Sequence, residues 1–263
     1  MKNPAFLNML RAPKIMFAKG TVIRDGYPFN LNLDNYSPED YEKIIPSLQE
    51  YEQRLLKVPG NSEGMHWIHL PDTVLFYSQR VFNLPYDTFI SRVNICHIGE
   101  FYRDSISFAT EIVERDDLDR PTRQAVRIVA LPQPNYAALM GKGNLDVYKL
   151  EKIDYSENEQ RLWMLTVKSP NGSAVCDDGL TSFNRTEDGK GTIVSFLACQ
   201  NFPVPPLMAL SRIDKWTWFK NTVTEQAYRD FCNTMMQNIQ DRYDGRDFRV
   251  GRSGSRLQAV LPR

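Results

Sequence analysis

Six strand-like segments constrain this chain more than any other feature of its sequence. Most of the connections between them are short and contain turn-forming residues, such as Pro170-Asn171-Gly172. A parallel pair of strands needs a long crossover, whereas a short turn can join an antiparallel pair. The middle of the chain is therefore predicted to be an antiparallel meander. Its strands, rich in β-branched and aromatic residues, cover residues 105–114, 123–131, 146–154, 161–168, 174–186 and 191–200.

A long amphipathic helix is predicted after the meander, over residues 224–243, with a shorter helix before it over residues 207–220. The long helix carries apolar residues at intervals of three and four, which is the spacing of a single helical face. This stripe consists of Tyr228, Phe231, Met235 and Ile239. Such a stripe must pack against another apolar surface, and the predicted sheet is the candidate.

The first part of the chain has a different pattern. Ser37 followed by Pro38 and two acidic residues is typical of a helix start. Pro46 should kink the helix or divide it in two. Its apolar face consists of Tyr41, Ile44, Ile45, Leu48, Tyr51, Leu55 and Leu56. We expect this face to dock on the sheet domain or on a second subunit, in which case the chain is a homodimer.

Four segments resemble parts of one protein family. Residues 74–92 resemble its first strand, a proline-containing turn and a helix, and residues 97–103 its second helix. Residues 148–167 look like its paired strands across an acidic turn, and residues 187–194 like its last hairpin. The family is the START-like, birch-pollen-allergen-like superfamily, also called SRPBCC, and the resemblance covers residues 72–243.

This resemblance implies an α+β fold of the helix-grip kind, with a curved antiparallel sheet wrapped around the long C-terminal helix. The helix-grip domain would span residues 71–245. An N-terminal helical extension, residues 1–70, would precede it, and a basic tail, residues 246–263, would follow it.

The resemblance also implies a cavity between sheet and helix for a small apolar molecule, aromatic or polyketide-like. The side chains suited to its wall are Phe101, Phe108, Lys149, Trp163, Phe183, Phe196, Phe231 and Met235. The residues suited to acid–base chemistry on such a ligand are Tyr102, Arg103, Arg127 and Tyr228. Each of these residues also has an ordinary structural interpretation, in the core or on the surface. A lysine or arginine buried inside would need a carboxylate partner or an anionic ligand.

Three functions stay open at this point. One is a cyclase/aromatase-like lyase or isomerase, which requires polar groups that converge in the cavity. Another is a non-catalytic carrier of a lipid or other hydrophobic ligand, which requires an almost entirely apolar wall. The third is a protein–protein adaptor, which requires a filled core and an exposed apolar patch.

Charge and motifs argue against several other classes of function. Lys+Arg and Asp+Glu each total 32, so the formal net charge is zero and gives no general attraction to nucleic acid. The sequence has no Walker loop, Rossmann glycine motif or nucleophile elbow. His66 and His69 would point to opposite faces of an extended segment and lack a third strong ligand, so we expect no metal site. No cofactor is expected.

The start of the chain lacks an uninterrupted apolar run, so we expect neither a signal peptide nor a membrane span. The four cysteines are widely spaced, which does not suggest a framework of disulfides. A cytoplasmic location is therefore expected. The tail from residue 246 to 263 has five arginines against one aspartate, and it is interpreted as a solvated end or as a site for phosphate or an acidic partner.

Overall fold

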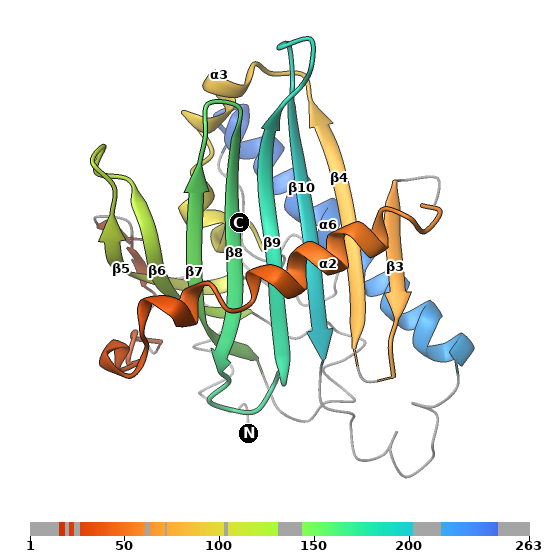
Figure 1. Ribbon diagram of the computed structural model, residues 1–263, viewed down its shortest axis with the longest axis horizontal. Helices are drawn as coiled ribbons and strands as arrows, with labels where there is room; N and C mark the ends of the chain where they lie inside the picture. The colour runs from red at the N-terminus through yellow and green to blue at the C-terminus, as the bar shows by residue number, and fades with distance from the viewer. Residues whose placement is uncertain are drawn as a thin grey trace, which may run out of the picture.

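The computed structural model describes residues 16–18, 21–23, 27–60, 64–71, 73–102, 105–130, 144–201 and 217–246, with the backbone alone for 16–18, 21–23, 106 and 217–227. Within these ranges, ten strands form one antiparallel sheet (Figure 1) in the order β1-β2-β5-β6-β7-β8-β9-β10-β4-β3. The strands are β1 (Met16–Ala18), β2 (Thr21–Ile23), β3 (Met65–His69), β4 (Val74–Phe82), β5 (Ser105–Arg115), β6 (Pro121–Ala130), β7 (Leu145–Tyr155), β8 (Glu159–Lys168), β9 (Cys176–Arg185) and β10 (Thr192–Asn201).

The six predicted strands of the meander are confirmed as β5 to β10, each paired antiparallel to the next along the chain. β4 joins the sheet beside β10, so the strand that precedes the meander in sequence lies next to the strand that ends it. β3 was not predicted. It lies inside the range expected to be a helical extension, and it pairs with β4 along its whole length.

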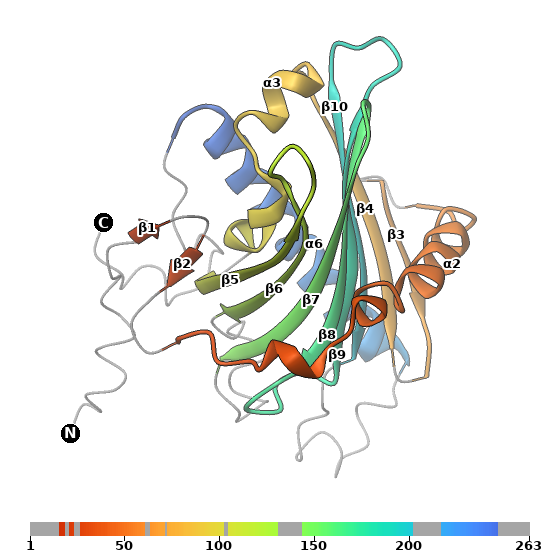
Figure 2. The ribbon, with the colours of Figure 1, turned by 60° about the vertical axis from the view of Figure 1, so that its left-hand side comes forward.

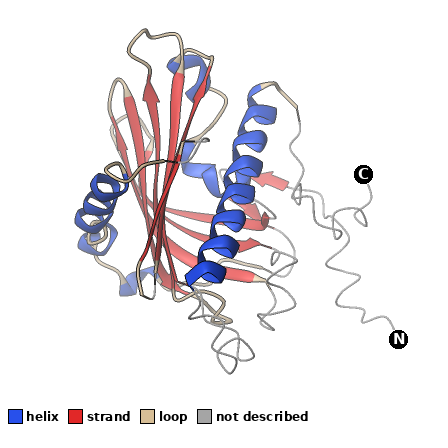
Figure 3. Ribbon diagram, turned by 90° about the vertical axis from the view of Figure 1, so that its right-hand side faces the viewer, coloured by secondary structure: helices blue, strands red, loops and turns tan. Residues whose placement is uncertain are grey.

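Helices cover both faces of this curved sheet (Figure 2). The inner face packs against α6 (Thr217–Tyr243), α3 (Tyr86–Ile90) and η3 (Ile95–Phe101). The outer face is covered by η1 (Leu33–Asn35), η2 (Pro38–Tyr41) and α2 (Ile45–Leu55). Figure 3 shows α6 and α2 on opposite sides of the sheet. The predicted α+β helix-grip architecture is therefore confirmed.

The long C-terminal helix is confirmed, and it begins earlier than predicted. α6 runs without a break over Thr217–Tyr243, so residues 217–220 are its first turn and not the end of a separate helix. The rest of the predicted shorter helix lies outside the described residues. The apolar stripe faces the sheet as predicted, since Tyr228, Met235 and Ile239 are buried. Gly245 has a φ of +71° at the helix end, a conformation that favours glycine.

The N-terminal extension docks on the outer face, which was one of the two expected arrangements. Ser37 and Asp40 form a capping box at the start of η2. α2 then begins at Ile45 with Pro46 in its first turn, so Pro46 divides the predicted helix. Leu48 and Leu55 are fully buried against side chains of β4, β8, β9 and β10.

Candidate functional site

A row of buried and half-buried polar side chains crosses the inner face of the sheet. The Lys149 ammonium on β7 lies 2.7 Å from the Asp177 carboxylate on β9. Asp177 also accepts a hydrogen bond from the Gln200 amide on β10. The side-chain oxygen of Gln200 accepts one from the Tyr228 hydroxyl on α6. These four residues, called the inner polar row below, link the sheet to the helix that it grips.

Strand register explains why these residues meet. Successive side chains of a strand point to opposite faces, and directly paired residues share a face. Asp177 pairs with Gln200 across β9 and β10, and Lys149 pairs with Val126 across β7 and β6. Val126 belongs to an apolar cluster on the inner face, and this places Lys149 inside as well.

Lys149 is a buried cation that keeps its proton. Its residue exposure is 2%. Burial by itself lowers the pKa of Lys149, but the Asp177 carboxylate outweighs it, and the pKa is raised above its ordinary value. An ammonium has three N–H donors. Among the described residues, Asp177 is its one hydrogen-bonding partner, so the ammonium has the capacity to bind a further acceptor.

Tyr102, one of the predicted catalytic residues, lies against this cation. The Lys149 Nζ is 5.8 Å from the centre of the Tyr102 ring, a cation–π contact. The Tyr102 ring packs edge-on against Phe231 of α6, with 5.4 Å between ring centres. Burial raises the pKa of Tyr102, so its hydroxyl stays protonated, and it donates to the Met164 sulfur at 3.2 Å. Tyr102 thus contacts Lys149 of the inner polar row, to which Tyr228 also belongs.

A buried carboxyl group lies two residues further along β7. Glu151 is 1% exposed and shares the inner face with Lys149. The Gln124 amide donates to Glu151 Oε2 at 2.6 Å and to the Cys96 carbonyl at 2.8 Å, which joins β6 and β7 to η3. Burial raises the pKa of Glu151 to about 7, against the opposing effects of Gln124 and Lys149.

The predicted apolar wall residues are mostly brought together. Phe101, Phe183, Phe196 and Met235 belong to one buried cluster between the sheet, η3 and α6, and half-buried Phe231 packs against it. Phe108 belongs to a second cluster on the inner face, with Val126 and Ile128. In the described part of the chain these side chains contact one another as a packed core. A cavity between sheet and helix stays a prediction.

Two predicted site residues do not point into this interior. Arg127 lies on the outer face, where its guanidinium donates to both carboxylate oxygens of Asp146, at 3.0 and 2.8 Å, and to the Pro28 carbonyl at 2.6 Å. Trp163 packs on the outer face in the apolar cluster that contains Leu48 and Leu55 of α2, called the α2 cluster below. The physical reason is the phase of the strands, because adjacent residues serve opposite faces. Arg103 lies outside the described residues.

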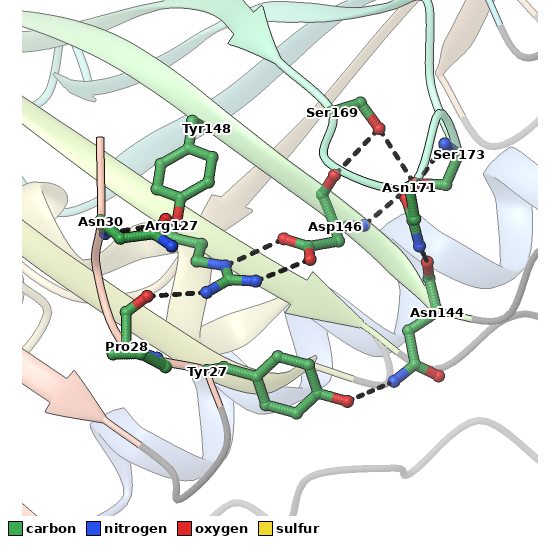
Figure 4. Close-up of polar contacts among 10 residues, drawn as sticks. All are labelled: Tyr27, Pro28, Asn30, Arg127, Asn144, Asp146, Tyr148, Ser169, Asn171 and Ser173. Atoms are coloured by element: carbon green, nitrogen blue, oxygen red, sulfur yellow. Dashed lines mark hydrogen bonds and ion pairs between the residues drawn. The ribbon is translucent and has the colours of Figure 1, made fainter. Parts of the chain in front are cut away.

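Figure 4 shows that Arg127 belongs to a polar contact which fixes the N-terminal segment to the sheet. Tyr148, its partner across β6 and β7, hydrogen-bonds to Asn30. The Tyr27 hydroxyl accepts a hydrogen bond from the Asn144 amide at 2.9 Å. Arg127 is therefore paired and covered where it lies, on the face opposite to Lys149.

Several solved structures are similar to this chain at low sequence identity. One is a protein of Thermus thermophilus, with 16% identity, a TM-score of 0.43, and coverage of 64% of this chain and 96% of that one. Another is the human StAR-related lipid transfer protein 5, with 8% identity, a TM-score of 0.48, and coverage of 78% and 98%. A third is the Zhui aromatase/cyclase from a Streptomyces species, with 12% identity, a TM-score of 0.41, and coverage of 65% and 95%. By sequence, no family model and no curated protein matches the chain.

The chain has a helix-grip fold. What decides this is the observed architecture, a curved antiparallel meander with β4 beside β10 and α6 packed along its inner face. Identities this low concern the fold alone, so the comparisons do not assign a ligand or a reaction to this helix-grip chain.

Sequence reasoning named Lys149, Tyr102 and Tyr228 but missed the residues that connect them. Asp177, Gln200, Glu151 and Gln124 were not predicted as site residues. Glu151 had a usable signal, because it stands two residues from Lys149 in a predicted strand and must share its face. Asp177 and Gln200 had none, because their pairing depends on the register between β9 and β10.

Other features of the helix-grip domain are less suited to chemistry. Within the described ranges, no group of three His, Cys, Asp or Glu side chains is placed to hold a metal ion. None of the helices in those ranges is long and apolar enough to cross a membrane. A surface hollow of about 390 Å³ lies at the β9–β10 hairpin, away from the inner polar row. It is lined by Val81, Asn83, Thr186, Asp188, Lys190 and Gly191.

Proposed function

We propose that this chain binds a small, mostly apolar molecule between the inner face and α6, and that Lys149 holds a polar group of the ligand. The observation that carries the proposal is a lysine with 2% exposure whose ammonium has one carboxylate partner among the described residues. A buried ion pair is weak evidence for stability, because apolar residues of similar volume are often as stable in its place. Ligand binding accounts for a charge in this position.

The surroundings of Lys149 define the chemistry of the ligand. Tyr102 contacts the ammonium and packs edge-on against Phe231, and Val126 pairs with Lys149 across the sheet, so aromatic and apolar surface flanks the cation and favours an aromatic or polyketide-like molecule. The ammonium supplies hydrogen-bond donors, so the polar group of the ligand is an acceptor oxygen, as in a carbonyl, hydroxyl or carboxylate. A mostly apolar body with one oxygen-bearing end fits both conditions.

Glu151 adds the capacity for acid–base chemistry on the same ligand. Its pKa of about 7 means that both the acid and the carboxylate are populated near neutral pH. Residues two apart on a strand lie about 7 Å apart, so a ligand oxygen at Lys149 leaves neighbouring ligand atoms near Glu151. The activity that we propose is proton transfer in a cyclase/aromatase-like lyase or isomerase.

The two alternatives have less support. A carrier needs an almost entirely apolar wall, whereas Lys149, Asp177 and Glu151 are charged or titratable groups on the inner face. An adaptor needs an exposed apolar patch. The large apolar side chains that are exposed in the described ranges lie on separate elements and turns. They are Leu56, Val81, Val113, Leu118 and Val175.

The proposal is tested by thermal unfolding with a panel of aromatic and aliphatic ketones, phenols and carboxylic acids. A ligand present at a hundred times its dissociation constant stabilises the fold by about 2.7 kcal/mol. We expect at least one compound to stabilise the wild type and to lose that effect in Lys149→Met. Arg127→Met is the matched control, because it removes a buried cation from the opposite face. The proposal fails if no compound stabilises the wild type, or if Lys149→Met keeps the full effect.

A further inference from the structure

Two cysteines lie side by side on the outer face, behind the inner polar row. Cys176 on β9 and Cys199 on β10 have their sulfur atoms 4.0 Å apart. They are diagonal neighbours, because Cys199 pairs with Asp178 and Cys176 with Asn201. Both sulfurs are free thiols. Cys199 is buried, whereas Cys176 is half-buried at the margin of the α2 cluster.

We propose that Cys176 and Cys199 are an oxidation site, which forms a disulfide on exposure to a hydroperoxide and thereby alters the Lys149 site. One thiolate attacks the peroxide O–O bond, which gives a sulfenic acid and releases water. The second thiol then displaces the sulfenic oxygen as a second water, and the S–S bond forms. Two thiols are oxidised, and one hydrogen peroxide is reduced to two waters.

Contacts around the pair make the two thiols unequal. The Cys176 sulfur lies 3.2 Å from the Asp178 carboxylate and 3.2 Å from the Cys199 carbonyl, and its single proton can be donated to one acceptor at a time. When that proton is directed at the Cys199 sulfur, the contact lowers the pKa of the Cys199 thiol. Cys199 therefore forms the reactive thiolate more readily than Cys176 does. The remaining cysteines are distant, because Cys96 lies on η3 and Cys232 on α6, both on the inner side.

The geometry also connects this pair to the interior. Asp177 follows Cys176 and Gln200 follows Cys199, and both point to the inner face. A disulfide has an S–S distance of about 2.05 Å, so the sulfurs must approach by about 2 Å. Diagonal residues lie about 7–8 Å apart, so this approach requires β9 and β10 to shift against each other. Such a shift displaces Asp177, which contacts Lys149, and Gln200, which contacts Tyr228.

The disulfide itself is tested on the reduced full-length chain. After a slight excess of hydrogen peroxide, we expect the intact mass to fall by two hydrogen atoms and a peptide map to join Cys176 to Cys199. Cys96→Ser and Cys232→Ser should behave like the wild type, whereas Cys176→Ser and Cys199→Ser should not form the bond. A gain of oxygen mass without a cross-link, or a cross-link to another cysteine, overturns the proposal.

The effect on the inner polar row rests on the proposed function and has its own readout. Hydrogen exchange is compared, before and after peroxide, in peptides that contain Lys149 and Tyr228, which are distant from both cysteines in sequence. We expect exchange to become about threefold faster in the oxidised wild type, with no change in treated Cys199→Ser. Equal exchange in a chain that has formed the disulfide overturns the coupling. Failure of the ligand panel with reduced protein instead refutes the proposed function and leaves the oxidation result intact.

Discussion

Lys149 and Arg127 form the same kind of ion pair on opposite faces of one sheet. Lys149 lies 2.7 Å from Asp177 on the inner face, and Arg127 lies 2.8 Å from Asp146 on the outer face. They are close in the sheet, because Arg127 pairs with Tyr148, the residue before Lys149. One cation faces α6, and the other faces the N-terminal segment. The two substitutions are therefore a matched pair for separating effects of the interior from effects on the fold.

The first prediction concerns the stability of the inner pair. Lys149→Met leaves Asp177 buried without its cation, and we expect a loss of about 3–5 kcal/mol in the free energy of unfolding. The double variant Lys149→Met/Asp177→Leu should recover most of that loss, because the unpaired charge is gone. Urea unfolding measures both. A single variant that loses less than about 1 kcal/mol would contradict a buried ion pair.

The second prediction concerns the pH dependence of stability. The pKa of Glu151 is raised by burial from 4.5 to about 7, so the unfolded chain releases this proton first as the pH rises. Between pH 4.5 and about 7 the folded state binds more protons, and the contribution of Glu151 to stability falls by roughly 3 kcal/mol. Below this window the contribution is fully present, and above it the loss is complete.

Glu151→Gln should remove that part of the pH dependence, because the amide does not titrate. Glu157→Gln, at an exposed turn position, is the control and should leave the profile unchanged. Chemical unfolding across the window gives the measurement. Identical profiles for Glu151→Gln and the wild type would show that Glu151 is not a buried acid.

The third prediction concerns the docking of the N-terminal extension. Leu48 is fully buried between α2 and the outer face, and its truncation to alanine should cost about 2–5 kcal/mol. Leu56, one residue beyond α2, is 53% exposed, and Leu56→Ala should change stability by less than about 0.5 kcal/mol. Equal effects of the two substitutions on the unfolding midpoint would contradict the packing of α2 on the sheet.

Much of the fold follows from local patterns in the sequence. The alternation of the strands and the turns between them predicted β5 to β10, and the stripe from Tyr228 to Ile239 predicted the face of α6. Several features did not follow, among them the short strands β1, β2 and β3. β3 is only five residues long, and its strand character depends on pairing with β4. The start of α6 at Thr217 did not follow either, because the sequence predicted one helix ending at residue 220 and another beginning at residue 224.

The site was predicted less completely, because its geometry depends on strand phase. β8 is apolar on both faces, so its pattern does not tell whether Trp163 or Met164 points inward. The structure places Met164 inside and Trp163 outside. The same uncertainty applied to Arg127, because the pattern of β6 does not tell which face of the sheet its side chain joins. Lys149 was identified by its residue type, but Asp177 could be assigned to it only with the sheet assembled.

The ligand that we propose for the interior binds to Lys149 through its polar group. Native mass spectrometry of freshly purified wild type, Lys149→Met and Arg127→Met tests it most directly. We expect a small-molecule adduct on the wild type, retained by Arg127→Met and lost or strongly reduced in Lys149→Met. An adduct equally abundant on Lys149→Met, or no adduct on any of the three, would rule out a ligand held by Lys149.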